Sequence, residues 1–109
     1  MDRLILCGSC AEGRGAGMAR ALESRLPDGV VIEFADCLNA CGDPIAMALR
    51  GPGKDVYLFA GVAADDVGDV TALARLYAEA ADGRIRDARP AGRLRQCLLG
   101  RVPGRGARD

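Results

Sequence analysis

Arg3-Leu-Ile-Leu-Cys-Gly-Ser-Cys10 is the first of two stretches that decide the fold, and Gly29-Val-Val-Ile-Glu-Phe34 is the second. Each contains a short run of apolar or β-branched residues, which is typical of a buried strand. Between them, apolar residues recur at four-residue spacing and predict an amphipathic helix over about residues 16–26. These residues are Met18, Leu22 and Leu26. Strand, helix and strand in this order predict a right-handed βαβ unit with parallel, adjacent strands.

The next stretch predicts a β-hairpin. Large and small residues alternate in Pro44-Ile-Ala-Met-Ala-Leu-Arg50, which suits a strand with one face on a thick core. Gly51-Pro-Gly-Lys54 is a tight-turn signal, and Asp55-Val-Tyr-Leu-Phe-Ala60 is the returning strand. The hairpin is expected to extend the sheet in antiparallel fashion.

A second helix is expected to follow the hairpin. It begins at Asp65 or Asp66 and runs to about Asp82, with Gly83 at the C′ position. Its apolar face consists of Val70, Leu73, Ala74 and Tyr77. A further short helix is expected around residues 92–99. The predicted fold is therefore α/β: β-α-β, then a β-hairpin, then α, with helices covering a four-stranded mixed sheet. This order resembles the minimal thioredoxin-like arrangement.

Length and charge predict one domain over residues 1–100 and a flexible basic tail over residues 101–109. The 109 residues have a formal net charge of zero, but residues 84–109 carry eight arginines against two aspartates. The tail lacks aromatic stacking partners, so we expect it to be solvated rather than bound to nucleic acid. No apolar run approaches the roughly 20 residues of a membrane span, and none resembles a signal-peptide core. We expect a cytoplasmic protein without membrane contacts.

Five cysteines and the absence of histidine limit the chemistry. Without histidine, serine–histidine or cysteine–histidine catalysis and imidazole metal sites are excluded. Four cysteines form two close pairs, Cys7/Cys10 and Cys37/Cys41, and each pair follows a predicted strand. Parallel neighbouring strands end at the same edge of a sheet, so the two pairs are expected to converge there. Cys97 lies outside the pairs in a Cys-Leu-Leu stretch and is expected to be a buried bystander.

Spacing alone leaves three interpretations of the four cysteines open. An iron–sulfur cluster suits four thiolates flanked by glycine-rich segments, whose backbone amides can approach the sulfurs. A structural zinc site usually has two C-x-x-C pairs, whereas the second pair here is C-x-x-x-C. Dithiol redox chemistry at Cys7 and Cys10 has thioredoxin-motif spacing, but it leaves Cys37 and Cys41 unexplained.

A family resemblance adds to this reading. Cys37-Leu-Asn-Ala-Cys-Gly-Asp-Pro44, followed by the alternating strand, resembles the second half of the cluster motif in thioredoxin-like 2Fe–2S ferredoxins and in the small cluster-binding subunit of respiratory complex I. More closely, nearly the whole chain resembles a bacterial family of small predicted metal-binding proteins, often encoded near cobalamin biosynthesis genes. The shared features are the C-x-x-C after the first strand, Gly51-Pro-Gly-Lys54, Tyr57-Leu-Phe59, Leu76-Tyr77 and Arg89-Pro90.

The resemblance implies a ferredoxin, a one-electron carrier that is not an enzyme and that serves cobalamin biosynthesis. It implies one 2Fe–2S cluster per chain on Cys7, Cys10, Cys37 and Cys41, a homodimer, and redox partner proteins as electron donor and acceptor. The first pair departs from the wider ferredoxin group, where a longer gap separates the cysteines. The alternatives are a zinc-binding or metal-handling module of the same fold, and a thioredoxin-like thiol oxidoreductase using Cys7 and Cys10.

Overall fold

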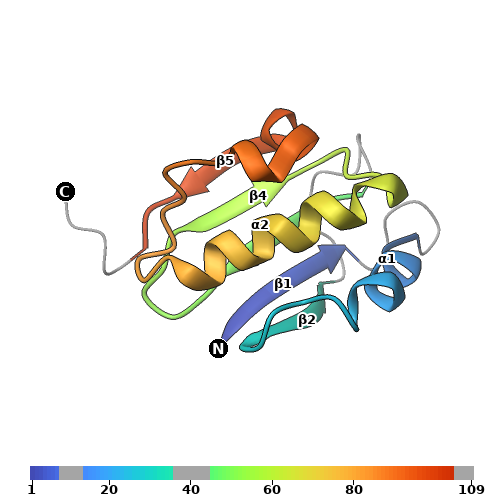
Figure 1. The fold of residues 1–109 in the computed structure, drawn as a ribbon, viewed down its shortest axis with the longest axis horizontal. Helices are drawn as coiled ribbons and strands as arrows, with labels where there is room; N and C mark the ends of the chain where they lie inside the picture. Colours follow the sequence, from blue (N-terminus) through green and yellow to red (C-terminus); the bar gives the residue numbers. More distant parts are fainter. Residues whose placement is uncertain (8–13, 36–44, 105–109) are drawn as a thin grey trace.

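A computed structural model describes residues 1–7, 14–35 and 45–104 and shows a mixed α/β fold. Its elements are β1 (Asp2–Cys7), α1 (Arg14–Leu22), β2 (Val30–Ala35), β3 (Met47–Arg50), β4 (Val56–Phe59), η2 (Ala64–Asp66), α2 (Val67–Glu79), η3 (Arg89–Gln96) and β5 (Leu98–Val102). The strands form one five-stranded sheet in the order β2-β1-β3-β4-β5 (Figure 1).

The first four strands pair as the sequence predicts. β1 and β2 are parallel neighbours, with Asp2 opposite Val30 and Cys7 opposite Ala35. β3 pairs antiparallel with β1 and with β4, so the hairpin is confirmed. In its turn, the Lys54 N–H donates to the Gly51 carbonyl at 3.0 Å, and Gly53 has a φ of +72°, a conformation that favours glycine.

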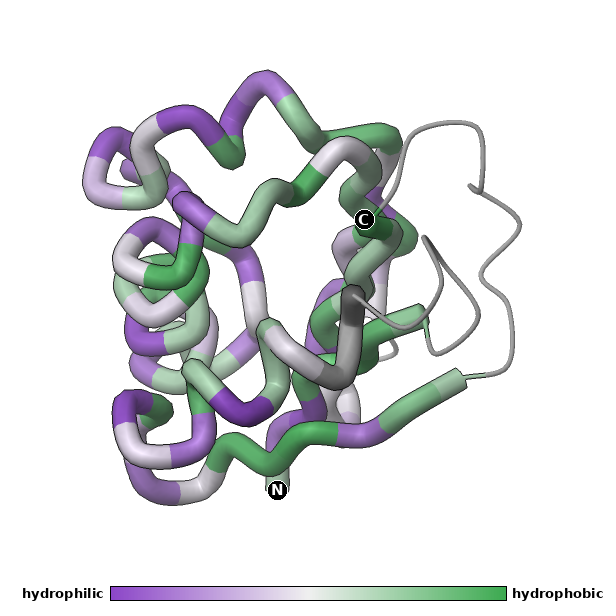
Figure 2. The backbone as a smooth tube through the Cα atoms, turned by 90° about the vertical axis from the view of Figure 1, so that its right-hand side faces the viewer, coloured by the Kyte–Doolittle hydropathy of each residue, from purple (hydrophilic) through white to green (hydrophobic). Residues whose placement is uncertain are grey.

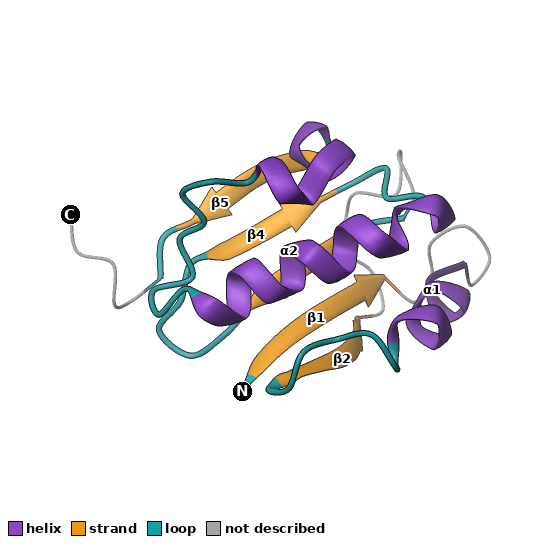
Figure 3. Cartoon of the chain, viewed as in Figure 1, coloured by secondary structure: helices purple, strands orange, loops and turns teal. Residues whose placement is uncertain are grey.

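The hydrophobic core lies between the helices and one face of the sheet (Figure 3). Alternate strand residues point to the same face, so β1, β3 and β4 each contribute two large side chains to this layer. These are Leu4, Leu6, Met47, Leu49, Tyr57 and Phe59. The predicted apolar face of the second helix is confirmed, because Val70, Leu73, Ala74 and Tyr77 are all buried. Viewed from the side, the helices stand on one side of the sheet and the mostly hydrophobic β2 runs along its lower edge (Figure 2).

Helix boundaries differ from the sequence-based expectations. α1 ends at Leu22 rather than near residue 26, and a turn over residues 23–25 follows it. α2 ends at Glu79, and Ala80 already has an extended backbone. Gly83 is therefore not at the C′ position. It has a φ of +74° in the turn that follows, which returns the chain towards β4. No helix among residues 1–7, 14–35 and 45–104 is long and apolar enough to cross a membrane.

The C-terminal segment contains a strand that the sequence analysis missed. Where a short helix around residues 92–99 was predicted, η3 ends at Gln96 and β5 pairs antiparallel with β4. The prediction of four strands is therefore wrong. Gly92, at φ +59° and ψ −127°, interrupts the helical conformation inside η3. All five residues of β5 are exposed, so no alternation of buried and exposed residues marked this strand in the sequence.

Asp55 attaches this segment to the rest of the domain. Its carboxylate is fully buried and accepts hydrogen bonds from Arg101 Nη1 at 2.6 Å and from the Gly104 N–H at 2.9 Å. Arg84 Nε lies 3.5 Å from the same carboxylate. The Gly104 amide and the Arg101 guanidinium hold the pKa of Asp55 below its usual value despite burial. Residues 101–104, which the sequence analysis assigned to a flexible tail, thus belong to the fold. Residues 105–109 lie outside the described residues.

Candidate metal centre at the end of the parallel strands

Cys7 is the candidate ligand that the structure describes, and it is the last residue of β1. Its side chain is fully buried. Its backbone lies between two neighbours, because Ala35 of β2 is its register partner and its N–H donates to the Ala46 carbonyl at 3.1 Å. A buried sulfur therefore stands where the parallel pair β1/β2 ends.

The other three predicted ligands, Cys10, Cys37 and Cys41, lie outside the described residues. The described positions that bracket them are close to Cys7 along the backbone. Ala35, its register partner, comes two residues before Cys37. Ala46, its hydrogen-bond partner, comes five residues after Cys41. The segment that carries Cys37 and Cys41 thus leaves and rejoins the described fold next to Cys7.

The segment after β4 holds Ile45, the first described residue after the segment that carries Cys37 and Cys41. Ile45 and Val62 exchange two backbone hydrogen bonds, at 3.0 and 3.1 Å. The next residue, Ala63, donates its N–H to the Asp66 carboxylate at 2.8 Å. Arg93 binds the same carboxylate through both Nε and Nη2, and its Nη2 also donates to the Gly61 carbonyl at 2.8 Å. This connection fixes the chain on both sides of Val62.

The Asp66–Arg93 pair was missed by sequence reasoning, since 27 residues separate its partners. Hydrogen bonding from Arg93 holds the pKa of Asp66 below its usual value and outweighs the opposing effect of burial. Asp66 also occupies the predicted helix start, as the N-cap residue of α2, but its carboxylate bonds backwards to Ala63 rather than forwards into the helix.

Cys97 is buried within the hydrophobic core, as predicted. It precedes β5, and the strands β3 and β4 lie between β5 and β1 in the sheet. Three inter-strand spacings correspond to about 14 Å between Cys97 and Cys7 along the sheet. The Cys97 sulfur lies 3.7 Å from the Gly61 carbonyl oxygen and 3.8 Å from the Arg93 carbonyl oxygen. Within the described residues, its surroundings are those of a packed side chain.

The described residues alone do not form a metal site. No group of three or more histidine, cysteine, aspartate or glutamate side chains that could hold a metal ion occurs among residues 1–7, 14–35 and 45–104. Of the four cysteines assigned to the cluster, only Cys7 lies within those ranges. The chemistry available at this edge is that of a buried thiol next to the ends of a cysteine-bearing segment.

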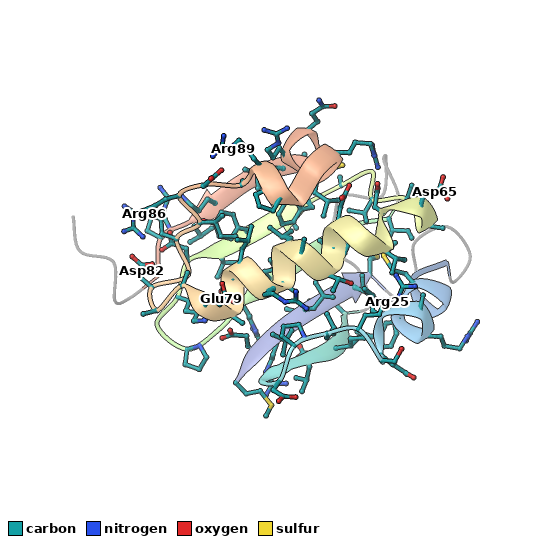
Figure 4. The ribbon with its side chains drawn as sticks, in the orientation of Figure 1. Arg25, Asp65, Glu79, Asp82, Arg86 and Arg89 are labelled. Atoms are coloured by element: carbon teal, nitrogen blue, oxygen red, sulfur yellow. The ribbon has the colours of Figure 1, made fainter. Side chains whose placement is uncertain are left out.

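The arginines of the C-terminal region are largely paired within the fold. Arg86 binds Asp82 at 3.3 Å in the segment between α2 and η3, and Arg89, the first residue of η3, binds Asp87 at 2.8 Å (Figure 4 labels Asp82, Arg86 and Arg89). The remaining ion pairs in this region are Arg84–Asp55, Arg101–Asp55 and Arg93–Asp66. The charge separation along the sequence therefore does not produce a row of uncompensated cations on the described surface.

Comparison with known proteins gave one finding. A family model described as "Protein of unknown function (DUF1636)" matches residues 4–104. No curated protein and no solved structure matches the chain. The match includes all five cysteines and every described residue except the first three.

Proposed function

We propose that this chain, which belongs to the DUF1636 family, is a one-electron carrier that holds a 2Fe–2S cluster on Cys7, Cys10, Cys37 and Cys41. The observation that carries the proposal is the position of Cys7. Cys7, which is fully buried, ends β1 in register with Ala35 of β2. Cys37 comes two residues after Ala35 in the sequence.

The chain lengths are compatible with four converging thiolates. An extended chain spans at most about 3.6 Å per residue, so Cys10 lies within about 11 Å of Cys7 and Cys37 within about 7 Å of Ala35. Cys41 lies within about 18 Å of Ala46 by the same arithmetic. Ala35 and Ala46 are both backbone neighbours of Cys7. All four sulfurs can therefore reach one small volume at this edge without any change in the described fold.

The donor set also fits the group. Four thiolates are the ligands that 2Fe–2S clusters of the ferredoxin type use, and the chain has no histidine to replace any of them. When bound, such a cluster accepts and donates one electron. The protein's own contribution is to bury the Cys7 side of the site and to hold the returning chain through the Ile45–Val62 pair. Burial lowers the local dielectric and keeps water from the sulfur.

The fold supports the same proposal in its arrangement of elements. The structure has a βαβ unit, an antiparallel hairpin, a helix and the strand order β2-β1-β3-β4-β5. We propose that the first four strands and the two main helices correspond to a thioredoxin-like arrangement, with β5 as an addition. We extend the proposal to a cytoplasmic homodimer with one cluster per chain, which exchanges electrons with a reductase and an acceptor protein. Service to cobalamin biosynthesis belongs to the same proposal and rests on the family resemblance alone.

Two alternative functions use the same cysteines. A zinc-binding module would use the same four thiolates and would differ only in holding a zinc ion in place of the 2Fe–2S cluster. A thiol oxidoreductase would use Cys7 and Cys10, with a helix N-terminus at the motif to lower the pKa of the first thiol. In the sequence, a glycine-rich stretch separates the Cys7/Cys10 motif from the predicted helix, which favours the cluster over the dithiol.

Serine variants test the ligand set. Cys7→Ser, Cys10→Ser, Cys37→Ser and Cys41→Ser should each lose most visible absorption after anaerobic reconstitution, because a hydroxyl is a harder and more basic ligand than a thiolate. Cys97→Ser is the matched control and should keep full cluster occupancy, since Cys97 packs in the core away from β1. Full colour in Cys10→Ser together with bleaching in Cys97→Ser would refute the ligand assignment.

A further inference from the structure

An apolar pocket lies on the helical side of the sheet, separate from the cysteines. It has a volume of about 130 Å³ and receives side chains from β4, α2, η3, β5 and the segment before η3. Its inner wall consists of the buried residues Tyr57, Phe59, Leu73 and Leu94. The exposed residues Leu98 and Arg95 mark its opening. No cysteine of the described residues lines it.

The pocket's size and lining select an apolar guest. An engineered apolar cavity of about 150 Å³ takes up benzene, so this volume suits a group of about six carbon atoms. The Tyr57 hydroxyl already accepts a hydrogen bond from the Ile85 N–H at 3.0 Å. A guest with several hydrated polar groups would lose its water here without enough partners to replace it.

Arg95 differs from its neighbours in its charge partners. The other five arginines between Arg84 and Arg101 each pair with a carboxylate. Arg95 Nε donates to the Gly92 carbonyl at 3.1 Å, but no carboxylate of the described residues lies within 4.0 Å of its guanidinium. Asp87 is close enough for the charge of Arg95 to lower its pKa, but its carboxylate is held by Arg89 through two hydrogen bonds of 2.9 and 2.8 Å. A cation without a carboxylate partner therefore stands at the mouth of an apolar pocket.

We propose that this pocket binds a small amphipathic carboxylate, with the apolar body between Phe59 and Leu94 and the carboxylate on Arg95. A planar guanidinium with unused N–H donors matches a carboxylate in two-point geometry. A single cation suits one negative charge rather than a nucleotide or another multiply charged ligand. The proposal is independent of the proposed electron-transfer function, because none of these residues brackets the cysteine segment.

Ligand-observed NMR titration of the full chain with hexanoate tests the proposal, with 1-hexanol as the neutral probe of matched length. Hexanoate should bind more tightly than hexanol. Arg95→Gln should weaken hexanoate binding about tenfold or more and leave hexanol binding unchanged, because it removes the positive charge and its charge-assisted hydrogen bond while keeping a polar side chain. Arg86→Gln is the matched control, since Arg86 is exposed, pairs with Asp82 and does not line the pocket.

A filling variant tests the location. Ala88→Leu adds three carbons at a half-buried lining position and should abolish binding of both probes while circular dichroism shows an intact fold. Three results would each overturn the proposal. They are no saturable hexanoate binding by the natural chain, unchanged binding by Ala88→Leu, and equal weakening of hexanoate by Arg95→Gln and Arg86→Gln.

Discussion

Replacing Asp55 by asparagine should destabilise the domain by removing the charge that holds its C-terminal segment. The side chain keeps its shape, and its amide oxygen can still accept from the Gly104 N–H. The bond from Arg101, at 2.6 Å, loses its charged acceptor. Hydrogen bonds to charged groups contribute about 1.5–3 kcal/mol each. Arg84, at 3.5 Å, adds little.

The partial exposure of Arg101 and Arg84 limits the loss of stability in Asp55→Asn. Removing one partner of a fully buried ion pair costs about 3–5 kcal/mol, because the remaining charge stays buried. The Arg101 and Arg84 side chains are 38% and 42% exposed, so water can solvate them again. We therefore expect a loss of about 2–3 kcal/mol in the free energy of unfolding, which corresponds to a decrease of roughly 10–20 °C in Tm for a domain of this size.

Urea unfolding followed by circular dichroism measures this loss, with linear extrapolation to zero denaturant. Asp87→Asn is the control, because Asp87 is exposed and pairs with an exposed arginine; its midpoint should not change measurably. The pKa of Asp55 is lowered by folding, so its contribution is complete above its unfolded pKa of about 3.9 and is lost as the pH falls through the lower folded value. The gap between the natural chain and Asp55→Asn should therefore narrow below about pH 4. A loss under about 0.5 kcal/mol at pH 7, or a gap that stays constant down to pH 3, would refute this reasoning.

Three further outcomes are expected. Tyr77→Phe should lose about 1–2 kcal/mol in urea unfolding with unchanged secondary structure, because it removes the buried 2.6 Å bond from the tyrosine hydroxyl to the Asp55 carbonyl; an unchanged midpoint would contradict this. Gly83→Ala should lower the free energy of unfolding by at least about 2 kcal/mol, because the new Cβ would lie 2.6 Å from Lys54 Cβ and the backbone has a φ of +74°. Gly53→Ala is the control, with a φ of +72° but no atom within 4 Å of the new Cβ, and should lower it by only about 1 kcal/mol. Equal losses in the two variants would show that the close contact is unimportant. The proposed 2Fe–2S cluster should have a reduction potential below zero, because the chain has no histidine for ligation of the Rieske type. A clearly positive potential in voltammetry would contradict all-cysteine ligation.

Local pattern was sufficient to predict the first four strands and both main helices. Leu4 and Leu6 alternate with residues of the opposite face, and Val70, Leu73, Ala74 and Tyr77 recur at helical spacing, so each element carried its own periodic signal. The position of Cys7 beside β2 followed from the rule that a βαβ unit brings parallel strands together.

The missed features depend on contacts between distant residues. β5 has no buried residue to mark it, and it is held by pairing with β4 and by Arg101 reaching Asp55, 46 residues earlier in the sequence. Arg93 was counted only as part of a basic region, because nothing near it in sequence reveals its bonds to Asp66 and Gly61. Charge counts along a chain give no information on which charges meet in the fold.

The metal content of the natural chain, purified without oxygen, tests the central claim most directly. Iron, acid-labile sulfide and zinc should be measured on the same sample, together with electron paramagnetic resonance before and after reduction by dithionite. The electron-carrier account predicts about two irons and two sulfides per chain, red-brown colour and a paramagnetic signal that appears only after one-electron reduction. A colourless protein with one zinc per chain and no sulfide would contradict it.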